Sequence, residues 1–141
     1  MNRKKSAGLI LTALSVIAAV IALVYYNINA GTNYFKSLGI SPAVEICLIL
    51  AIACEAVFLI AGLKKQPVWA DILPVITGIC LVVAMLNFIS ARVNGMAAII
   101  TFQNNAANMA DMQSAIVGIA ACAVALIITI IASFFDVTVE A

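Results

Sequence analysis

The sequence predicts an all-α membrane protein, a four-helix bundle whose transmembrane helices run up, down, up and down. Four apolar stretches of 20 or 21 residues indicate this fold: residues 7–26, 43–63, 72–91 and 115–135. At about 1.5 Å per residue each would form a helix roughly 30 Å long, which matches the hydrocarbon core of a bilayer. Charged residues make up only 9% of the chain, against about 25% in a soluble domain. We therefore expect a single membrane domain of 141 residues with the lipid bilayer as its solvent.

The first stretch, 7–26, follows the basic residues 3–5, which is also the arrangement of a secretory signal peptide. Its apolar part is longer than the roughly 7–15 residues of a signal sequence. It also ends in Tyr25 and Tyr26, and tyrosine is common at the membrane interface. We expect it to be retained as the first span.

Proline and aspartate mark the ends of the second and third spans. Pro42 stands immediately before 43–63, where the missing N–H of proline costs least. Pro67 suits a tight inner turn, and Asp71 is expected to cap the third helix, with Pro74 in its first turn. A turn this short makes the second and third spans antiparallel neighbours.

The segment 92–114, between the third and fourth spans, is crowded with amides but has no glycine or proline after Met96, which favours helix. We expect Asn104 or Asn105 to be the N-cap of a fourth helix that begins about two turns outside the membrane. The apolar stretch 97–102 is too short to span, and would lie on the membrane surface or on the outer ends of the helices.

Basic residues predict the orientation. If the spans alternate, five of them fall on one side and two on the other: Arg3, Lys4, Lys5, Lys64 and Lys65 against Lys36 and Arg92. Because basic residues accumulate on the cytoplasmic side, both termini are predicted to be cytoplasmic. We expect a multi-pass protein of the cell membrane, and specifically of a bacterial cytoplasmic membrane. The basic residues form no patch of the kind that binds nucleic acid.

Glu55 is the most unusual residue of the predicted spans, because it places a carboxyl near the middle of 43–63. An ionised carboxylate at that depth costs on the order of 2.5–3.5 kcal/mol, so Glu55 is expected to be protonated or to have a partner. Counting from the cytoplasmic helix ends predicts a polar layer of Glu55 with Ser15, Thr77 and Thr129. Two interpretations remain open: a proton-exchanging or cation-binding carboxylate, and a neutral acid that hydrogen-bonds to Ser15 or Thr77.

Glu45 and Arg92 are expected near the outer ends of the second and third spans. Counted through the inner turn, they lie about 27 Å and about 30 Å above the cytoplasmic helix ends. Antiparallel neighbours would bring the two side chains together. The sequence therefore predicts an interfacial ion pair that holds the helices, in preference to a pair that binds substrate.

Small and sulfur-containing residues indicate packing rather than chemistry. Ser114, Gly118 and Cys122 recur at every fourth position and predict a small-residue face, within the bundle or between protomers. The four cysteines form no C-x-x-C pair and the chain has no histidine, so we expect neither a metal site nor a redox pair. The three methionines of 92–114 suggest a deformable partner-binding surface rather than a copper site.

Three classes of function are compatible with these features. The first is a non-enzymatic accessory or structural subunit that binds another membrane protein, or a second copy of itself. The second is an oligomeric small transporter or channel that uses Glu55 for proton or cation coupling. An enzyme is the weakest of the three, because the usual acid, base, nucleophile and metal-binding residues are not found together and no cofactor motif is present.

Overall fold

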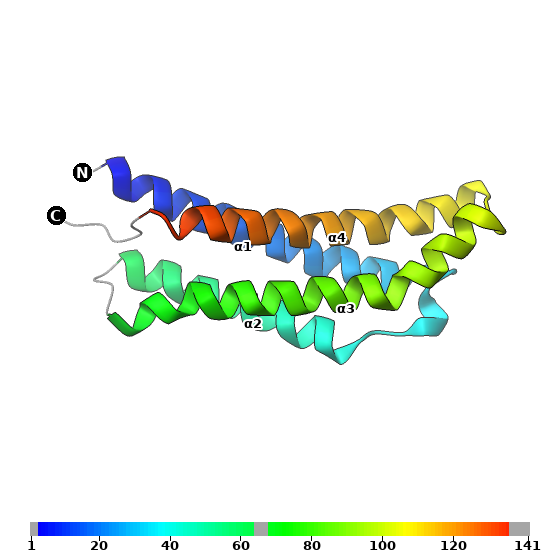
Figure 1. Ribbon diagram of the computed structural model, residues 1–141, viewed down its shortest axis with the longest axis horizontal. Helices are drawn as coiled ribbons and strands as arrows, with labels where there is room; N and C mark the ends of the chain where they lie inside the picture. Colours follow the sequence, from blue (N-terminus) through cyan, green and yellow to red (C-terminus); the bar gives the residue numbers. More distant parts are fainter. Residues whose placement is uncertain (1–2, 64–67, 136–141) are drawn as a thin grey trace.

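The computed structural model describes residues 3–63 and 68–135, which form four long helices and two short 3-10 helices, and no strand within those ranges. The long helices are α1 (Arg3–Ala30), α2 (Pro42–Leu63), α3 (Leu73–Thr101) and α4 (Ala106–Ala132), with η1 (Lys36–Leu38) before α2 and η2 (Val68–Ile72) before α3. Consecutive long helices are antiparallel, so the beginning of α1 and the end of α4 lie at the same end of the molecule (Figure 1). The predicted all-α architecture of four long apolar helices is confirmed.

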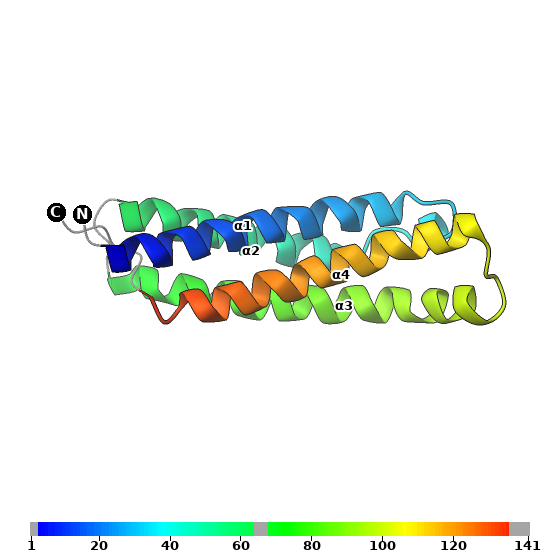
Figure 2. The same cartoon turned by 90° about the horizontal axis from the view of Figure 1, so that it is seen from above.

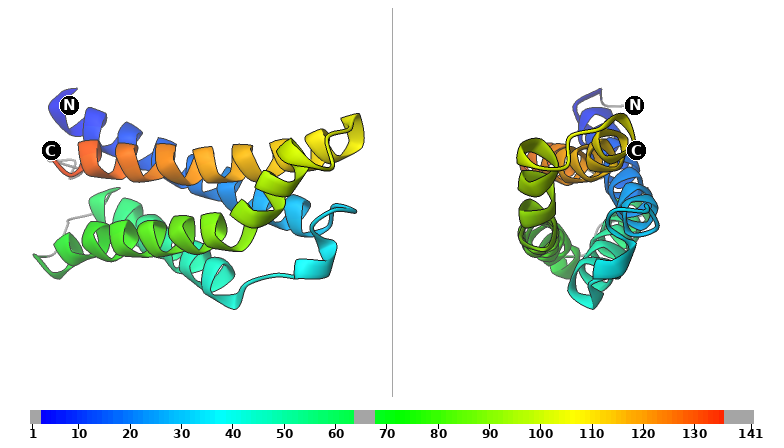
Figure 3. Two further views of the ribbon diagram at one scale, coloured as in Figure 1. Left: turned by 45° about the vertical axis from the view of Figure 1, so that its right-hand side comes forward. Right: turned by 90° about the vertical axis from the view of Figure 1, so that its right-hand side faces the viewer.

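The four helices form a ring in which each packs on two neighbours. α1 contacts α4 and α2, and α3 contacts α2 and α4. The end-on view in Figure 3 shows this ring, and Figure 2 shows the helices aligned along the long axis of the molecule. Much of the buried core consists of alanine, including Ala19 and Ala22 of α1 and Ala115 and Ala125 of α4. Such small residues let helix backbones approach each other closely, as is usual in membranes.

The outside of the bundle is apolar. Many isoleucine, valine and leucine side chains of all four helices are exposed, as a lipid-facing surface requires. Each helix is also long and apolar enough to cross a membrane. The molecule is therefore a small membrane protein. The side on which its termini lie stays a prediction, and the predicted inner turn with Lys64, Lys65 and Pro67 lies outside the described residues.

All four helices are longer than the predicted spans, α2 by only one residue. α3 has 29 residues and α2 has 22, which correspond to lengths of about 43 Å and about 33 Å. α3 continues through residues 92–101, which were expected to leave the membrane region as an outer segment. Only residues 102–105 connect α3 to α4. Asn105 is the N-cap of α4, and its side chain accepts a hydrogen bond from the amide of Asn108 at 2.8 Å, as the sequence predicts.

The beginning of α3 differs from the prediction. Its N-cap is Ile72 rather than Asp71, and the side chain of Ile72 makes no capping hydrogen bond. The reason is that Val68–Ile72 winds into η2, which places Asp71 inside a 3-10 turn. Pro74 lies in the first turn of α3, where its missing N–H is tolerated.

The predicted small-residue face of α4 packs inside the bundle. Ser114, Gly118 and Cys122 are all buried. A Cβ atom at Gly118 would lie only 2.8 Å from Cε2 of Phe88 on α3, so the absence of a side chain makes room for that ring. The chain therefore uses this face between its own helices.

The connection between α1 and α2 covers the end of the bundle that lies away from the start of α1, where α2 is shorter than its neighbours. Phe35 is fully buried there and forms a small core with Ile99 and Met112. Met96 and Met109 pack against this core. The ring of Phe35 thus covers Met112 from within the chain, while Met96 and Met109 stay half-buried, and the expectation of a methionine-rich partner surface stays a prediction.

Candidate functional site

Glu55 lies in a buried polar layer that joins three helices. Its side chain is only 3% exposed. Ser15 of α1 and Thr129 of α4 each donate a hydrogen bond to Oε1 of Glu55, both at 2.7 Å. The two hydroxyl oxygens are 2.5 Å apart. The structure therefore brings together three of the four residues of the predicted layer, and links α2 to both α1 and α4.

The number of protons in this layer favours a neutral carboxyl. The oxygens of Ser15, Thr129 and Glu55 Oε1 contact one another pairwise. Ser15 and Thr129 also lie 3.2 Å and 2.8 Å from the carbonyl oxygen of Ala125. Each hydroxyl supplies one proton. Two protons cannot fill all of these contacts at once. A proton on the carboxyl would supply one more, and Oε1 would then donate to one of the two hydroxyls instead of accepting from it. A neutral acid is also the cheaper form within a bilayer.

The second carboxyl oxygen of Glu55, Oε2, has no hydrogen-bond partner among the described residues. Oε2 of Glu55 is buried and makes no hydrogen bond in the described structure. Beside Glu55 is a cavity of about 20 Å³, which is room for about one water molecule. Thr77, the fourth residue of the predicted layer, is buried on α3, and its hydroxyl likewise has no partner among the described residues.

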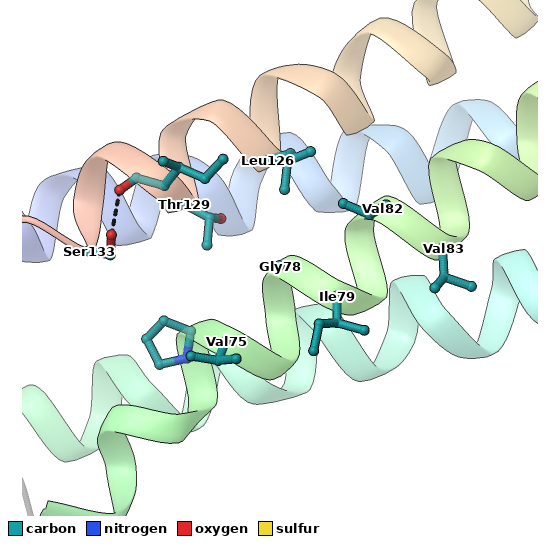
Figure 4. A pocket seen from close by; sticks show the side chains of 10 residues that line it. Val75, Gly78, Ile79, Val82, Val83, Leu126, Thr129 and Ser133 are labelled. Atoms are coloured by element: carbon teal, nitrogen blue, oxygen red, sulfur yellow. Dashed lines mark hydrogen bonds between the residues drawn. The ribbon is translucent and has the colours of Figure 1, made fainter.

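A larger groove opens between α3 and α4, on the outside of the bundle. It has a volume of about 490 Å³ and is lined almost entirely by apolar side chains. Figure 4 shows it, with Gly78 on the α3 side and Thr129 and Ser133 on the α4 side. The groove and the small cavity beside Glu55 share three lining residues: Pro74, Thr129 and Ser133.

Arg92 and Glu45 do not form the predicted ion pair. Arg92 is only 1% exposed. Its Nε donates to Oδ1 of Asn29 at 2.7 Å, and its Nη2 donates to the carbonyl oxygen of Gly39 at 3.0 Å. Oε1 of Glu45 is buried without a hydrogen-bond partner in the described structure. The physical reason is that α1 continues to Ala30. The side-chain amide of Asn29 therefore lies at the same depth as the guanidinium of Arg92 and accepts its hydrogen bond.

Two aromatic rings complete the surroundings of Arg92. Cζ of Arg92 lies 5.6 Å from the ring centre of Tyr26 and 5.5 Å from that of Phe35. Both distances are within cation–π range. An amide, a carbonyl and two rings therefore take the place of the predicted carboxylate partner.

Asn29 extends this cluster to α4. Its Nδ2 donates to Oγ of Ser114 at 3.0 Å and to the carbonyl oxygen of Asp111 at 3.2 Å. The carboxylate of Asp111 in turn accepts from the backbone amide of Tyr34 at 3.1 Å. A second polar layer thus joins α1, α3, α4 and the connection before α2. Sequence reasoning missed Asn29, although it follows Tyr26 by three residues and so lies on the same helical face.

The cysteines take no part in either layer. Cys47, Cys54 and Cys80 are half-buried and Cys122 is buried, and all four are free thiols. Within residues 3–63 and 68–135, no group of three or more histidine, cysteine, aspartate or glutamate side chains could hold a metal ion.

Comparisons with models of protein families, with curated proteins and with solved structures found no match to this chain. The fold nevertheless defines its class, a small four-helix membrane protein, and its role is argued from its own residues.

Proposed function

We propose that this protein is a non-enzymatic accessory or structural subunit of a larger membrane assembly. The observation that carries the proposal is the closure of the bundle around Glu55. Ser15 and Thr129 hydrogen-bond to its carboxyl, and the adjacent cavity has room for only about one water. A conduit across a bilayer of about 30 Å would need far more space. Hydrogen bonds between membrane helices chiefly hold them together.

The neighbours of the two buried ionisable side chains, Glu55 and Arg92, support a non-enzymatic role. Glu55 contacts hydroxyls, and Arg92 contacts an amide, a carbonyl and aromatic rings. General acid–base and nucleophilic catalysis both use a base placed against the reacting group. Neither layer offers such a pair.

We propose that the tip of the α3–α4 hairpin contacts the partner, which is another membrane protein. Phe102 is 88% exposed at this tip, and the amides that follow it are also exposed: Gln103, Asn104 and Asn105. The tip forms one extreme end of the molecule (Figure 1). An exposed aromatic surrounded by polar groups is typical of the anchor of a protein interface. Positive charges near the opposite end support placing this tip outside a bacterial cytoplasmic membrane.

Substitution of Phe102 tests the proposed contact. We expect Phe102→Ser to lower co-purification of the partner from gently solubilised native membranes at least about tenfold, a loss of about 1.4 kcal/mol. Phe134→Ser is the matched control, because Phe134 is 83% exposed at the other end of the bundle. Quantitative mass spectrometry of the tagged protein measures the effect. Equal recovery with both variants, or a wild-type protein that runs only as a monomer, would contradict the proposal.

One observation favours a small transporter as the second candidate, namely the unpaired Oε2 of Glu55. The two candidates differ in a liposome flux assay with the purified protein. The accessory role predicts no proton or cation flux for the wild type. Flux that Glu55→Gln abolishes, in a variant with unchanged helix content, would replace the accessory role with the transporter.

A further inference from the structure

We propose that Glu55 forms the floor of a ligand site that is entered from the lipid through the α3–α4 groove, and that its ligand is a small lipid-soluble amine. The site goes beyond the proposed accessory function, since binding requires neither transport nor a partner. Three observations carry the inference: an unpartnered buried carboxyl oxygen, a water-sized cavity beside it, and an apolar groove that shares residues with that cavity.

The groove suits the apolar body of such a ligand. Its volume of about 490 Å³ lies within the range of roughly 300–1,000 Å³ that is usual for small-molecule sites. Its walls are valine and isoleucine side chains of α3 facing Leu126 and Ile130 of α4. At Gly78 an added Cβ would meet no atom within 4 Å, so the α3 wall is open at that point (Figure 4).

The cavity suits the polar head. At about 20 Å³ it accepts a group the size of a water molecule, which an amine nitrogen is. Because Pro74, Thr129 and Ser133 line both spaces, a ligand whose body lies in the groove can place its head beside Glu55.

The carboxyl group of Glu55 determines which polar head group fits the cavity. Oε1 of Glu55 is already occupied by Ser15 and Thr129, whereas Oε2 has no partner. Thr129 and Ser133, the hydroxyls that line both spaces, already have acceptors elsewhere: Glu55 or the carbonyl of Ala125 for Thr129, and the carbonyl of Ile130 for Ser133. The site therefore has an excess of acceptors. An amine complements it. The free amine takes up the carboxyl proton, the hydroxyls of Ser15 and Thr129 then both donate to Oε1 of the carboxylate, and the resulting ammonium donates to Oε2. A fatty acid would add acceptors to a site that needs a donor.

Carbodiimide labelling tests this site in the full-length protein in vesicles. Dicyclohexylcarbodiimide is lipid-soluble, and a protonated carboxyl adds across one of its C=N bonds, after which the adduct rearranges to a stable acylurea. We expect this reagent to modify Glu55, with the site located by tandem mass spectrometry. N,N-Dimethyloctylamine, a tertiary amine that cannot form an amide with the activated carboxyl, should lower the labelling at least about fivefold, whereas 1-octanol at the same concentration should not.

Two phenylalanine substitutions on α3 test the route. Gly78→Phe fills the groove without touching Glu55 and should reduce labelling at least about fivefold. Ile76→Phe is the control, because Ile76 is exposed on the same helix but does not line the groove, and it should label like the wild type. The proposal is overturned if Glu55 of the native protein does not react while the denatured protein does. Equal labelling of Gly78→Phe and Ile76→Phe would exclude the groove as the entrance, and equal protection by octanol would exclude the amine.

Each outcome is independent of the proposed accessory function. Loss of the amine site would leave co-purification of the partner unaffected, and loss of the partner would leave carbodiimide labelling unaffected.

Discussion

Replacement of Arg92 by methionine should lower the free energy of unfolding by about 3 kcal/mol. Methionine keeps an unbranched apolar chain but donates no hydrogen bond, so Oδ1 of Asn29 and the carbonyl oxygen of Gly39 lose their donors. An unsatisfied buried acceptor costs about 1–3 kcal/mol, although the average for hydrogen bonds between membrane helices is nearer 0.6 kcal/mol. The cation–π contacts with Tyr26 and Phe35 are also lost. Titration of sodium dodecyl sulfate into micelles, followed by circular dichroism, measures the change.

Glu45→Gln is the matched control for Arg92. If the two side chains formed an ion pair, removing either charge would destabilise the protein by a similar amount. In the structure Arg92 instead bonds to Asn29 and Gly39, so Glu45→Gln should change stability by less than about 1 kcal/mol. Equal losses for the two variants would contradict the second polar layer, in which Arg92 bonds to Asn29 and Gly39.

Gly118→Leu should be the most damaging single substitution on α4. Even the Cβ atom would lie 2.8 Å from Cε2 of Phe88 and 3.5 Å from Cβ of Tyr25. The longer leucine side chain would force α4 away from α3 and α1. Overpacking of this kind costs about 1–3 kcal/mol, and more when backbones separate. We therefore expect a loss of at least about 3 kcal/mol, or failure to fold, measured by the same titration.

Gly78→Leu is the control for this prediction. Gly78 also lies within a transmembrane helix, but a Cβ atom there has no neighbour within 4 Å. Replacing it should leave stability unchanged or raise it by about 0.5–1 kcal/mol, because glycine is a poor helix former. The double variant Gly118→Leu with Phe88→Ala should recover part of the loss, since the small residue at 88 removes the clash. Equal effects at the two glycines would contradict the packing of α4 on α3.

The sequence predicted the features that depend on length, composition and local chemistry. Four apolar stretches of bilayer length predicted four helices, and Asn105 was correctly placed as one of two candidate caps of α4. The height of Glu55, Ser15 and Thr129 followed from counting residues along helices of known rise. Height alone does not give the direction in which a side chain points. Thr77 has a similar height, but its hydroxyl makes no hydrogen bond to the described residues of this layer.

The errors have a common cause, which is the treatment of polar residues as membrane boundaries. Arg92 was assigned to the outer interface because a bilayer does not solvate a lone charge. In the folded chain Asn29, Gly39 and two aromatic rings solvate it, and α3 continues past it for nine residues. Those partners come from segments 53 to 66 positions away in the sequence. The groove between α3 and α4 likewise depends on the distance between the two helices, and no local sequence pattern predicts that distance.

Cysteine accessibility in intact cells tests the membrane bundle most directly. Single cysteines replace Asn33, Asn104, Trp69 or Ser133 in a background in which the four native cysteines are alanine; the first two positions lie at one end of the bundle and the last two at the other. We expect a membrane-impermeant maleimide to label positions 33 and 104 in intact cells, and positions 69 and 133 only after lysis. Labelling of 33 and 104 from opposite sides, or recovery of the protein in the soluble fraction without detergent, would contradict a four-helix membrane bundle with both ends of the chain in the cytoplasm.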